Sequence, residues 1–250
     1  MKQGKSKAVG HPAKPARKAA DKGSSKAPKK VPGKAPEDAQ RTSPYHHGSL
    51  RTGLLEAAER ILERDGIQGL TLRAAAREAG VSHAAPKNHF GDLSGLLSEL
   101  AAVGFRRFVA MMLGNGPDGG SASPGPNPDP GQRMGAIGRG YVAFACAHPD
   151  LFLLMFRSER LDMTRPALRD AVNEASNVLA GAVSARREEA VEQALTLPQA
   201  AGIVGAWSLV HGFAMLLLDG RLRTILSRLP DGTTPDQLLG AIFESGRRQP

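Results

Sequence analysis

Residues 45–96 decide the fold, with the sequence YHHGSLRTGLLEAAERILERDGIQGLTLRAAAREAGVSHAAPKNHFGDLSGL. The first part of this stretch repeats apolar side chains every three or four positions, which is the spacing of one face of an α-helix. Six of them predict a helix over 49–64: Leu50, Leu54, Ala57, Ala58, Ile61 and Leu62. Ser49 is a candidate N-cap, and Gly66 ends the helix because glycine accepts a left-handed backbone without steric cost.

The second part of the stretch predicts two short helices around a tight turn. Gly80 stops a helix that Thr71 caps and that buries Leu72, Ala75, Ala76 and Ala79. Ser82 then caps a helix over 83–90, in which Pro86 is tolerated because it falls near the first turn. A helix, a turn containing glycine and a second helix have the spacing of a helix-turn-helix.

The third predicted helix has polar side chains on one side. His83, Lys87 and Asn88 are placed to point outward, while Ala84 and Phe90 point toward the core. A short helix with such donors suits the major groove of DNA, where they read base edges and phosphates. The alternative is an αα-hairpin within an ordinary helical bundle, because short helix pairs are common in all-α proteins.

The same stretch resembles the N-terminal domain of the tetracycline-repressor (TetR) family of transcriptional regulators. The resemblance rests on Tyr45-His46-His47-Gly48, Ala57-Ala58, Gly66, Gly69-Leu70-Thr71-Leu72-Arg73, Ala79-Gly80-Val81-Ser82, Ala85-Pro86, His89-Phe90 and Leu96-Leu97. With the residue pattern, it implies DNA contacts from Thr71, Arg73, Ser82, His83, Ala84, Lys87, Asn88 and His89. Two positions depart from the family: Lys87 replaces a usual aromatic that touches the DNA backbone, and Leu93 replaces a usual lysine.

The rest of the chain predicts a helical body. Helices are expected over 92–113, from Gln132 to a break at His148-Pro149, from Pro166, from Pro198 to Leu218 and after Pro235, with a flexible loop over 114–131. The apolar run over 151–156 fits a strand or a buried helix, and its helical neighbours favour a helix.

This body is similar to a TetR C-terminal domain of the Trp-His-Gly type. The similarity rests on Ala147-His148-Pro149-Asp150-Leu151-Phe152 and Ala206-Trp207-Ser208-Leu209-Val210-His211-Gly212, and it implies dimerisation through the last long helices and binding of a small-molecule effector. Candidate ligand-binding residues are Tyr141, Phe144, Phe152, Met155, Trp207 and His211. Trp207 and His211 are four positions apart and so share a helix face, although His211 is equally compatible with a satisfied core histidine.

No catalytic or metal site is expected. Cys146, His148 and Asp150 match no strong zinc spacing, and the His46-His47 pair lies where the family enters its first helix. The sequence contains no convincing nucleophile with a base partner, no paired carboxylates and no phosphate-binding glycine loop. We therefore expect a protein that is not an enzyme and needs no cofactor.

The charge is concentrated before the helix-turn-helix. Residues 1–44 contain twelve Lys or Arg and three Asp or Glu, a net charge of +9, whereas 45–96 contains six of each sign. The first segment has too few large apolar residues to fold, which predicts a disordered basic arm. Such an arm is either a solvated extension or a segment that lies along DNA and steepens the salt dependence of binding.

The single cysteine excludes an intramolecular disulfide and fits a reducing bacterial cytoplasm, where the protein would lie on the nucleoid. There is no uninterrupted apolar run of membrane-spanning length and no secretory signal, so no membrane association is expected.

The sequence thus predicts an all-α chain with a disordered arm over 1–44, a homeodomain-like helix-turn-helix domain over 45–92 and an effector-binding and dimerisation bundle over 93–250. The predicted function is a ligand-responsive repressor that binds a palindromic operator as a homodimer. The alternatives are a nucleoid-type protein that binds DNA through its arm and an all-helical small-molecule-binding protein.

Overall fold

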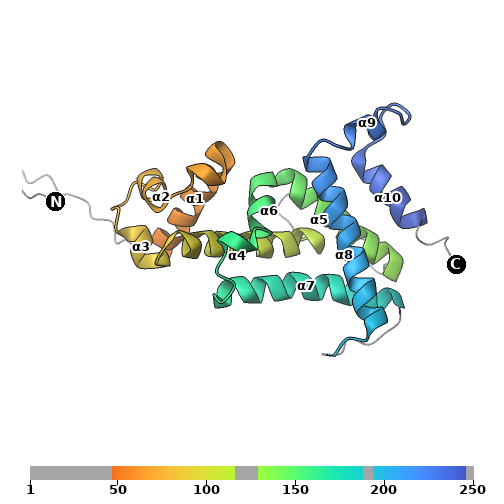
Figure 1. Ribbon diagram of the computed structural model, residues 1–250, viewed down its shortest axis with the longest axis horizontal. Coiled ribbons are helices and arrows are strands. Elements are labelled where there is room, and N and C mark those ends of the chain that lie inside the picture. The colour runs from red at the N-terminus through yellow and green to blue at the C-terminus, as the bar shows by residue number, and fades with distance from the viewer. Residues whose placement is uncertain (1–46, 116–128, 188–193, 246–250) are drawn as a thin grey trace, which may run out of the picture. The chain divides into compact units, whose positions relative to one another are not determined.

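A computed structural model describes residues 47–115, 129–187 and 194–245, and the predicted arm over 1–44 lies outside them. Every regular element in these ranges is helical, which confirms the all-α prediction. The elements are α1 (His47–Gly69), α2 (Leu72–Glu78), α3 (Ala85–Phe90), α4 (Leu93–Met112), α5 (Pro130–Ala147), α6 (Pro149–Met155), the short 3₁₀ turn η1 (Ser158–Arg160), α7 (Pro166–Arg187), α8 (Leu197–Leu218), α9 (Arg223–Leu226) and α10 (Pro235–Ser245) (Figure 1).

Thr71 and Gly80 set the boundaries of α2 as predicted, but both predicted ends of the first helix are wrong: α1 starts at His47, before the expected cap Ser49, and continues past Gly66 to Gly69. Gly66 has φ 68° and ψ −178°, a conformation that is essentially restricted to glycine, and it kinks α1 three residues before its end. The Thr71 hydroxyl accepts a hydrogen bond from the backbone N–H of Ala74 at 3.0 Å and so caps α2. Gly80 has φ 67° in the turn between α2 and α3.

The predicted start of the third helix is wrong by two residues. The helix begins at Ala85, its N-cap is Ala84, and Ser82 contributes its carbonyl to the turn instead of its hydroxyl to a cap. The reason is Pro86: in a helix starting at His83, its missing N–H would be the first that bonds within the helix. The later start exposes Ala84, which was expected in the core, and buries Ala85 and Pro86 instead.

The head, comprising α1, α2 and α3, has a tightly filled core. Phe90 at the end of α3 is 1% exposed, and Leu54, Ala58 and Ile61 of α1 are buried as predicted. α4 follows after Gly91, with the Asp92 carboxylate accepting from the backbone N–H of Gly95 at 2.8 Å. The chain thus passes from the head into the body through one short turn, which Asp92 closes as the N-cap of α4.

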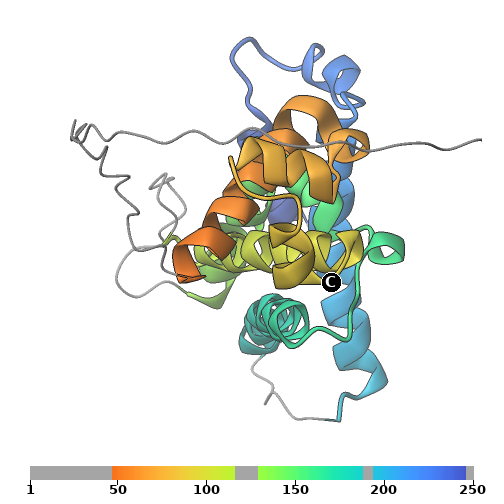
Figure 2. The same cartoon turned by 90° about the vertical axis from the view of Figure 1, so that its left-hand side faces the viewer.

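The body is built around α4, which packs along α7 and α5. In both views α7 lies on the side of α4 away from α1 and α2 (Figures 1 and 2). The break at His148-Pro149 separates α5 from α6 as predicted, and the apolar run that starts at Leu151 is helical. α8 packs on α5 and α7, and α10 packs on α5.

α8 is the most apolar long helix of the described chain and the least covered. Its most apolar window has a mean hydropathy of 1.8 but is only 17% buried, so by length and composition alone the helix could also cross a membrane. Val210, Phe213 and Ala214 are buried against the body. The large side chains exposed elsewhere on the helix are Leu197, Val204, Trp207, Leu209 and Leu216.

Candidate nucleic-acid interface and ligand cavity

The residues expected to contact DNA lie at the start of α2, in the turn that follows α2, or on α3. Seven of the eight are exposed: Thr71, Arg73, Ser82, His83, Ala84, Lys87 and Asn88; His89 is half-buried. Thr71 uses a lone pair of its hydroxyl for the α2 cap, so its O–H remains a donor for another acceptor. The face formed by α2 and α3 is thus accessible and rich in donors.

The net charge of residues 45–96 is zero, but the cations of the head are of two kinds. Those on α1 are paired with acidic side chains, whereas, in the part of the chain that the structure describes, those on the exposed face of α2 and α3 are not. Arg60 and Arg64 both pair with Glu78, at 3.2 and 3.3 Å, and Arg51 pairs with Glu99. Hydrogen bonds first from Arg60 and then from Arg64 hold the pKa of the Glu78 carboxyl below its usual value.

The exposed face of α2 and α3, which we call the reading face, carries cations that pair with no described acidic residue; α3 is accordingly the reading helix. Among the described residues, no acidic side chain forms an ion pair with Arg73 or Lys87. The acids nearest in sequence are already engaged, since Glu78 pairs with arginines of α1 and Asp92 caps α4. The α2–α3 face is therefore positive, which counting charges along the sequence did not reveal.

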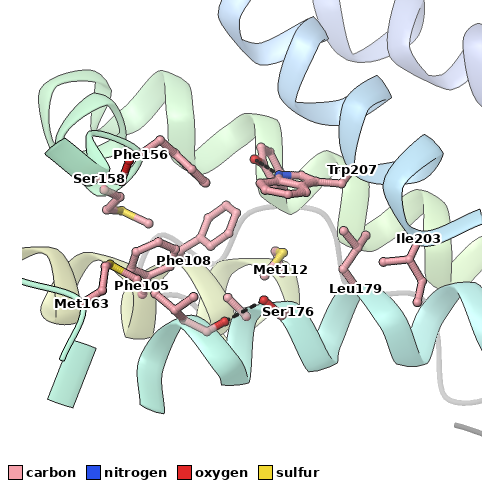
Figure 3. A pocket seen from close by; sticks show the side chains of 14 residues that line it. Phe105, Phe108, Met112, Phe156, Ser158, Met163, Ser176, Leu179, Ile203 and Trp207 are labelled. Atoms are coloured by element: carbon pink, nitrogen blue, oxygen red, sulfur yellow. Dashed lines mark hydrogen bonds between the residues drawn. The ribbon is translucent and has the colours of Figure 1, made fainter. Parts of the chain in front are cut away.

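The body contains a partly open cavity of about 370 Å³. It lies between α4, α5, α6, α7 and α8, and in Figure 3 Phe108, Leu179 and Trp207 point into the same space from three of these helices. The side chains around it are overwhelmingly apolar and none is charged: Phe105, Phe108, Met112, Tyr141, Met155, Phe156, Ser158, Met163, Val172, Ala175, Ser176, Leu179, Ile203 and Trp207. Such a wall suits an uncharged, largely apolar molecule of drug-like size.

One edge of the cavity has a chain of hydrogen bonds. The Trp207 indole N–H donates to the Tyr141 hydroxyl at 3.3 Å, and this hydroxyl lies 2.8 Å from Nδ1 of His211. Because the indole can only donate, the Tyr141 O–H is free to donate to Nδ1, an arrangement that requires the neutral His211 to carry its proton on Nε2. Burial raises the pKa of Tyr141 and lowers that of His211, so both groups are neutral near pH 7.

Three of the six predicted ligand-binding residues line the cavity: Tyr141, Met155 and Trp207. The other three lie in the layer behind it, where Phe144 and Phe152 are fully buried and His211 contacts Tyr141 and Phe152. Sequence reasoning missed the walls contributed by α7 and by the segment after α6. The apolar stripe of α7 was visible, but nothing in the sequence of 156–163 showed that it folds back onto α4.

Within the described chain, metal-ligand geometry is found at only one member of the sequence cluster Cys146, His148 and Asp150, namely His148. Glu59, Glu63 and His148 bring three ligand atoms within 4.8 Å of one another. The Glu59 carboxylate is already paired with Arg107, and the exposed Cys146 is not part of this group. Ion pairing therefore accounts for Glu59, and His46, a further histidine considered from the sequence, lies outside the described residues.

Comparison with known proteins gives a family match within the body and structural matches over most of the chain. Residues 134–234 match the family described as tetracyclin repressor-like, C-terminal domain. A protein of unknown function from Rhodococcus sp. RHA1 is 34% identical with a TM-score of 0.61, over 81% of this chain and 95% of that one. A bacterial regulatory protein in the tetR family from Rhodococcus RHA1 shares the fold at 14% identity and a TM-score of 0.51, over 80% and 95% of the two chains. No curated protein is significantly similar.

Proposed function

The chain belongs to the TetR family of transcriptional regulators, and on that premise we propose that it is a ligand-responsive repressor that binds a palindromic operator as a homodimer. It acts in the bacterial cytoplasm by binding and not by catalysis. The observation that carries this proposal is the uncharged cavity beside α4, the helix that begins three residues after the reading helix ends. An occupant of the cavity thus lies against the element that holds the head.

The reading face would be the exposed side of α3 and the first turn of α2. Lys87 and Arg73 would neutralise phosphates, and the hydroxyl of Thr71 would donate to another. Ser82, His83, Ala84, Asn88 and His89 would lie at or beside the base edges. Two copies would place α3 in successive major grooves, with half-sites roughly 34–36 Å apart.

The second copy would pack on the exposed side of α8. Ala201, Gly205, Ser208 and Gly212 recur at intervals of four, three and four and so form one face, opposite the buried Val210 and Phe213. A Cβ atom at Gly205 or Gly212 would have no neighbour within 4 Å in the single chain. Two helices can approach closely across such small residues, and the flanking exposed Val204, Leu209 and Leu216 would then be covered.

The effector would be an uncharged molecule, mainly apolar, with at most a few polar atoms. Burying a charge in this cavity without a partner is costly, because no charged side chain lines it. The polar groups available for orientation are the Ser158 and Ser176 hydroxyls and the edge formed by Tyr141 and Trp207. Binding one conformation better than another would shift the two heads and with them the affinity for DNA.

Selection of bound sequences from random duplex DNA tests the proposal. We expect the full chain to enrich a palindrome with half-sites about one helical turn apart. Its affinity for that palindrome should change when a neutral apolar fluorophore, N-phenyl-1-naphthylamine, saturates the cavity. Enrichment of no sequence at moderate salt would contradict the proposal.

A further inference from the structure

The segment between α6 and α7, residues 156–165, faces the cavity and the reading head at once; we call it the strap. On one side, Phe156, Ser158 and Met163 of the strap line the cavity. On its other side, polar groups of the strap bond to α3 and to the first turns of α4. Within the strap, a residue of the cavity wall and a residue that contacts the head are only two positions apart, at Met163 and Arg165.

A short relay of hydroxyl groups ties the strap to α4. The backbone N–H of Asp162 donates to Ser98 Oγ at 2.8 Å, and the Ser98 hydroxyl donates to the Ser94 carbonyl at 2.7 Å. The Ser94 hydroxyl in turn donates to the Arg160 carbonyl at 3.3 Å. Ser98 is fully buried, so this relay is shielded from water and costly to leave unsatisfied.

Arg165 reaches beyond α4 to the reading helix itself. Its Nη2 donates to the carbonyl of Phe90, the last residue of α3, at 2.6 Å. This carbonyl is one of the four that the end of a helix leaves without an internal partner. Gly95 makes the contact possible, because a Cβ atom there would lie 2.0 Å from that carbonyl oxygen and 2.3 Å from Nη2.

The same guanidinium joins a charged group that also holds α1. Arg165 Nη1 lies 3.8 Å from one oxygen of Glu99, while Arg51 of α1 pairs with the other oxygen at 2.5 Å. The Arg51 guanidinium also lies over the Phe90 ring, 5.7 Å from its centre. The strap, α1, α3 and α4 therefore meet at one point beside the last residue of the reading helix.

One donor of Arg165 is left over in this arrangement. Its Nε is buried without a hydrogen-bond partner, and the nearest carboxylate oxygen, on Asp162, is 3.6 Å away. A buried donor without a hydrogen-bond partner is costly, so Nε is the least satisfied group of this contact.

We propose that Arg165 is the positioning residue that couples the cavity to the reading helix. A ligand that displaces Phe156 or Met163 moves the strap, and Arg165 passes the displacement to α3 through the Phe90 carbonyl. This inference rests on the proposed function, because it assigns the route by which the ligand regulates DNA binding. Coupling of this kind changes affinity by roughly 5- to 150-fold in allosteric proteins.

Hydrogen–deuterium exchange of the full chain, without DNA, tests this route directly. N-phenyl-1-naphthylamine should alter the exchange of the backbone amides of α3 in the wild type. Arg165→Gln removes the charge and the fork of donors, so the probe should bind with the same affinity but leave α3 exchange unchanged. Arg165→Lys, which can still reach one acceptor, should restore part of the response.

Arg169→Gln is the matched control, since this arginine lies one turn further along α7 and pairs with the exposed Asp170. It should respond to the probe as the wild type does. A probe-dependent change in α3 exchange that survives in Arg165→Gln would overturn the inference. The proposed function is tested separately, by whether the wild type enriches an operator. The exchange experiment contains no DNA, so its result does not depend on that outcome.

Discussion

The head and the body of this chain handle apolar side chains in different ways. In the head, Leu54, Ile61 and Phe90 are at most 1% exposed and fill their core. In the body, the apolar residues leave a cavity of about 370 Å³ and an uncovered face on α8. The head is therefore complete in itself, while the body has two surfaces that a ligand and a second subunit would complete. Substitutions in the head and in the body should therefore affect stability, association and DNA binding to different extents.

The largest effect is expected in the core of the head. Phe90→Ala should lower the free energy of unfolding by about 3–5 kcal/mol, because it removes a fully buried ring from a tightly packed site. Phe156→Ala is the matched change in the body, where the ring is half-buried beside existing empty space, and it should cost clearly less. Urea denaturation of both variants measures the difference; equal losses would remove the contrast between head and body.

The next largest effect concerns the uncovered face of α8. Gly205→Leu should be tolerated by the single chain, because a side chain there meets open space, yet it should block the approach of a second α8. We expect the dimer dissociation constant to rise about ten- to a hundredfold, the cost of overpacking an interface by a few methylene groups.

Analytical ultracentrifugation checks the association of this variant. Gly53→Leu, a glycine of α1 that also has open space around its Cβ position, is the control and should associate like the wild type. A fully dimeric Gly205→Leu protein would place the interface elsewhere.

A smaller effect separates the two kinds of cation in the head. Lys87→Ala should weaken operator binding roughly tenfold and lower the slope of log affinity against log salt by about 0.9, as expected for one lost phosphate contact. Arg60→Ala removes the same formal charge, but from a residue already paired with Glu78, so it should change the slope little. Fluorescence anisotropy at several salt concentrations measures the slope for both variants. Identical slopes would contradict the distinction between paired and unpaired cations.

The smallest effect is a dependence of stability on pH at the cavity edge. Burial lowers the pKa of His211 from its usual value of 6.5, so the unfolded chain binds this proton more readily than the folded one. The stability that neutral His211 provides is present above pH 6.5 and declines as the pH falls toward its folded pKa. His211→Gln should flatten this part of the profile in thermal denaturation, and an unchanged profile would show that another group titrates there.

Local signals along the sequence predicted most of the fold. Thr71 and Gly80 fixed the boundaries of α2, and Gly66 the kink in α1, because their roles depend on backbone geometry within a few residues. Pro149, Pro166 and Pro235 marked helix starts for the same reason, since proline lacks the N–H that a helix interior needs. The error at α3 arose where two local signals conflicted, a serine suited to capping and a proline that required a later start.

The candidate sites depend on contacts that no local pattern contains. The pairs of Arg60 and Arg64 with Glu78 join α1 to α2, and only these pairs show that the reading face keeps its own cations. The strap contacts α4 across more than 60 positions of sequence, and Arg165 reaches Phe90 across 75. Such contacts follow from how the helices pack, so the cavity wall and the route to the head could not be predicted from spacing.

The central claim is that an uncharged ligand in the body controls DNA reading by the head. The most direct test measures the affinity of the full chain for its selected palindrome with and without saturating N-phenyl-1-naphthylamine. Our account predicts that the probe weakens binding roughly 5- to 150-fold and that the palindrome weakens probe binding by the same factor. Equal operator affinities in the two conditions, with the probe shown to occupy the cavity, would contradict it.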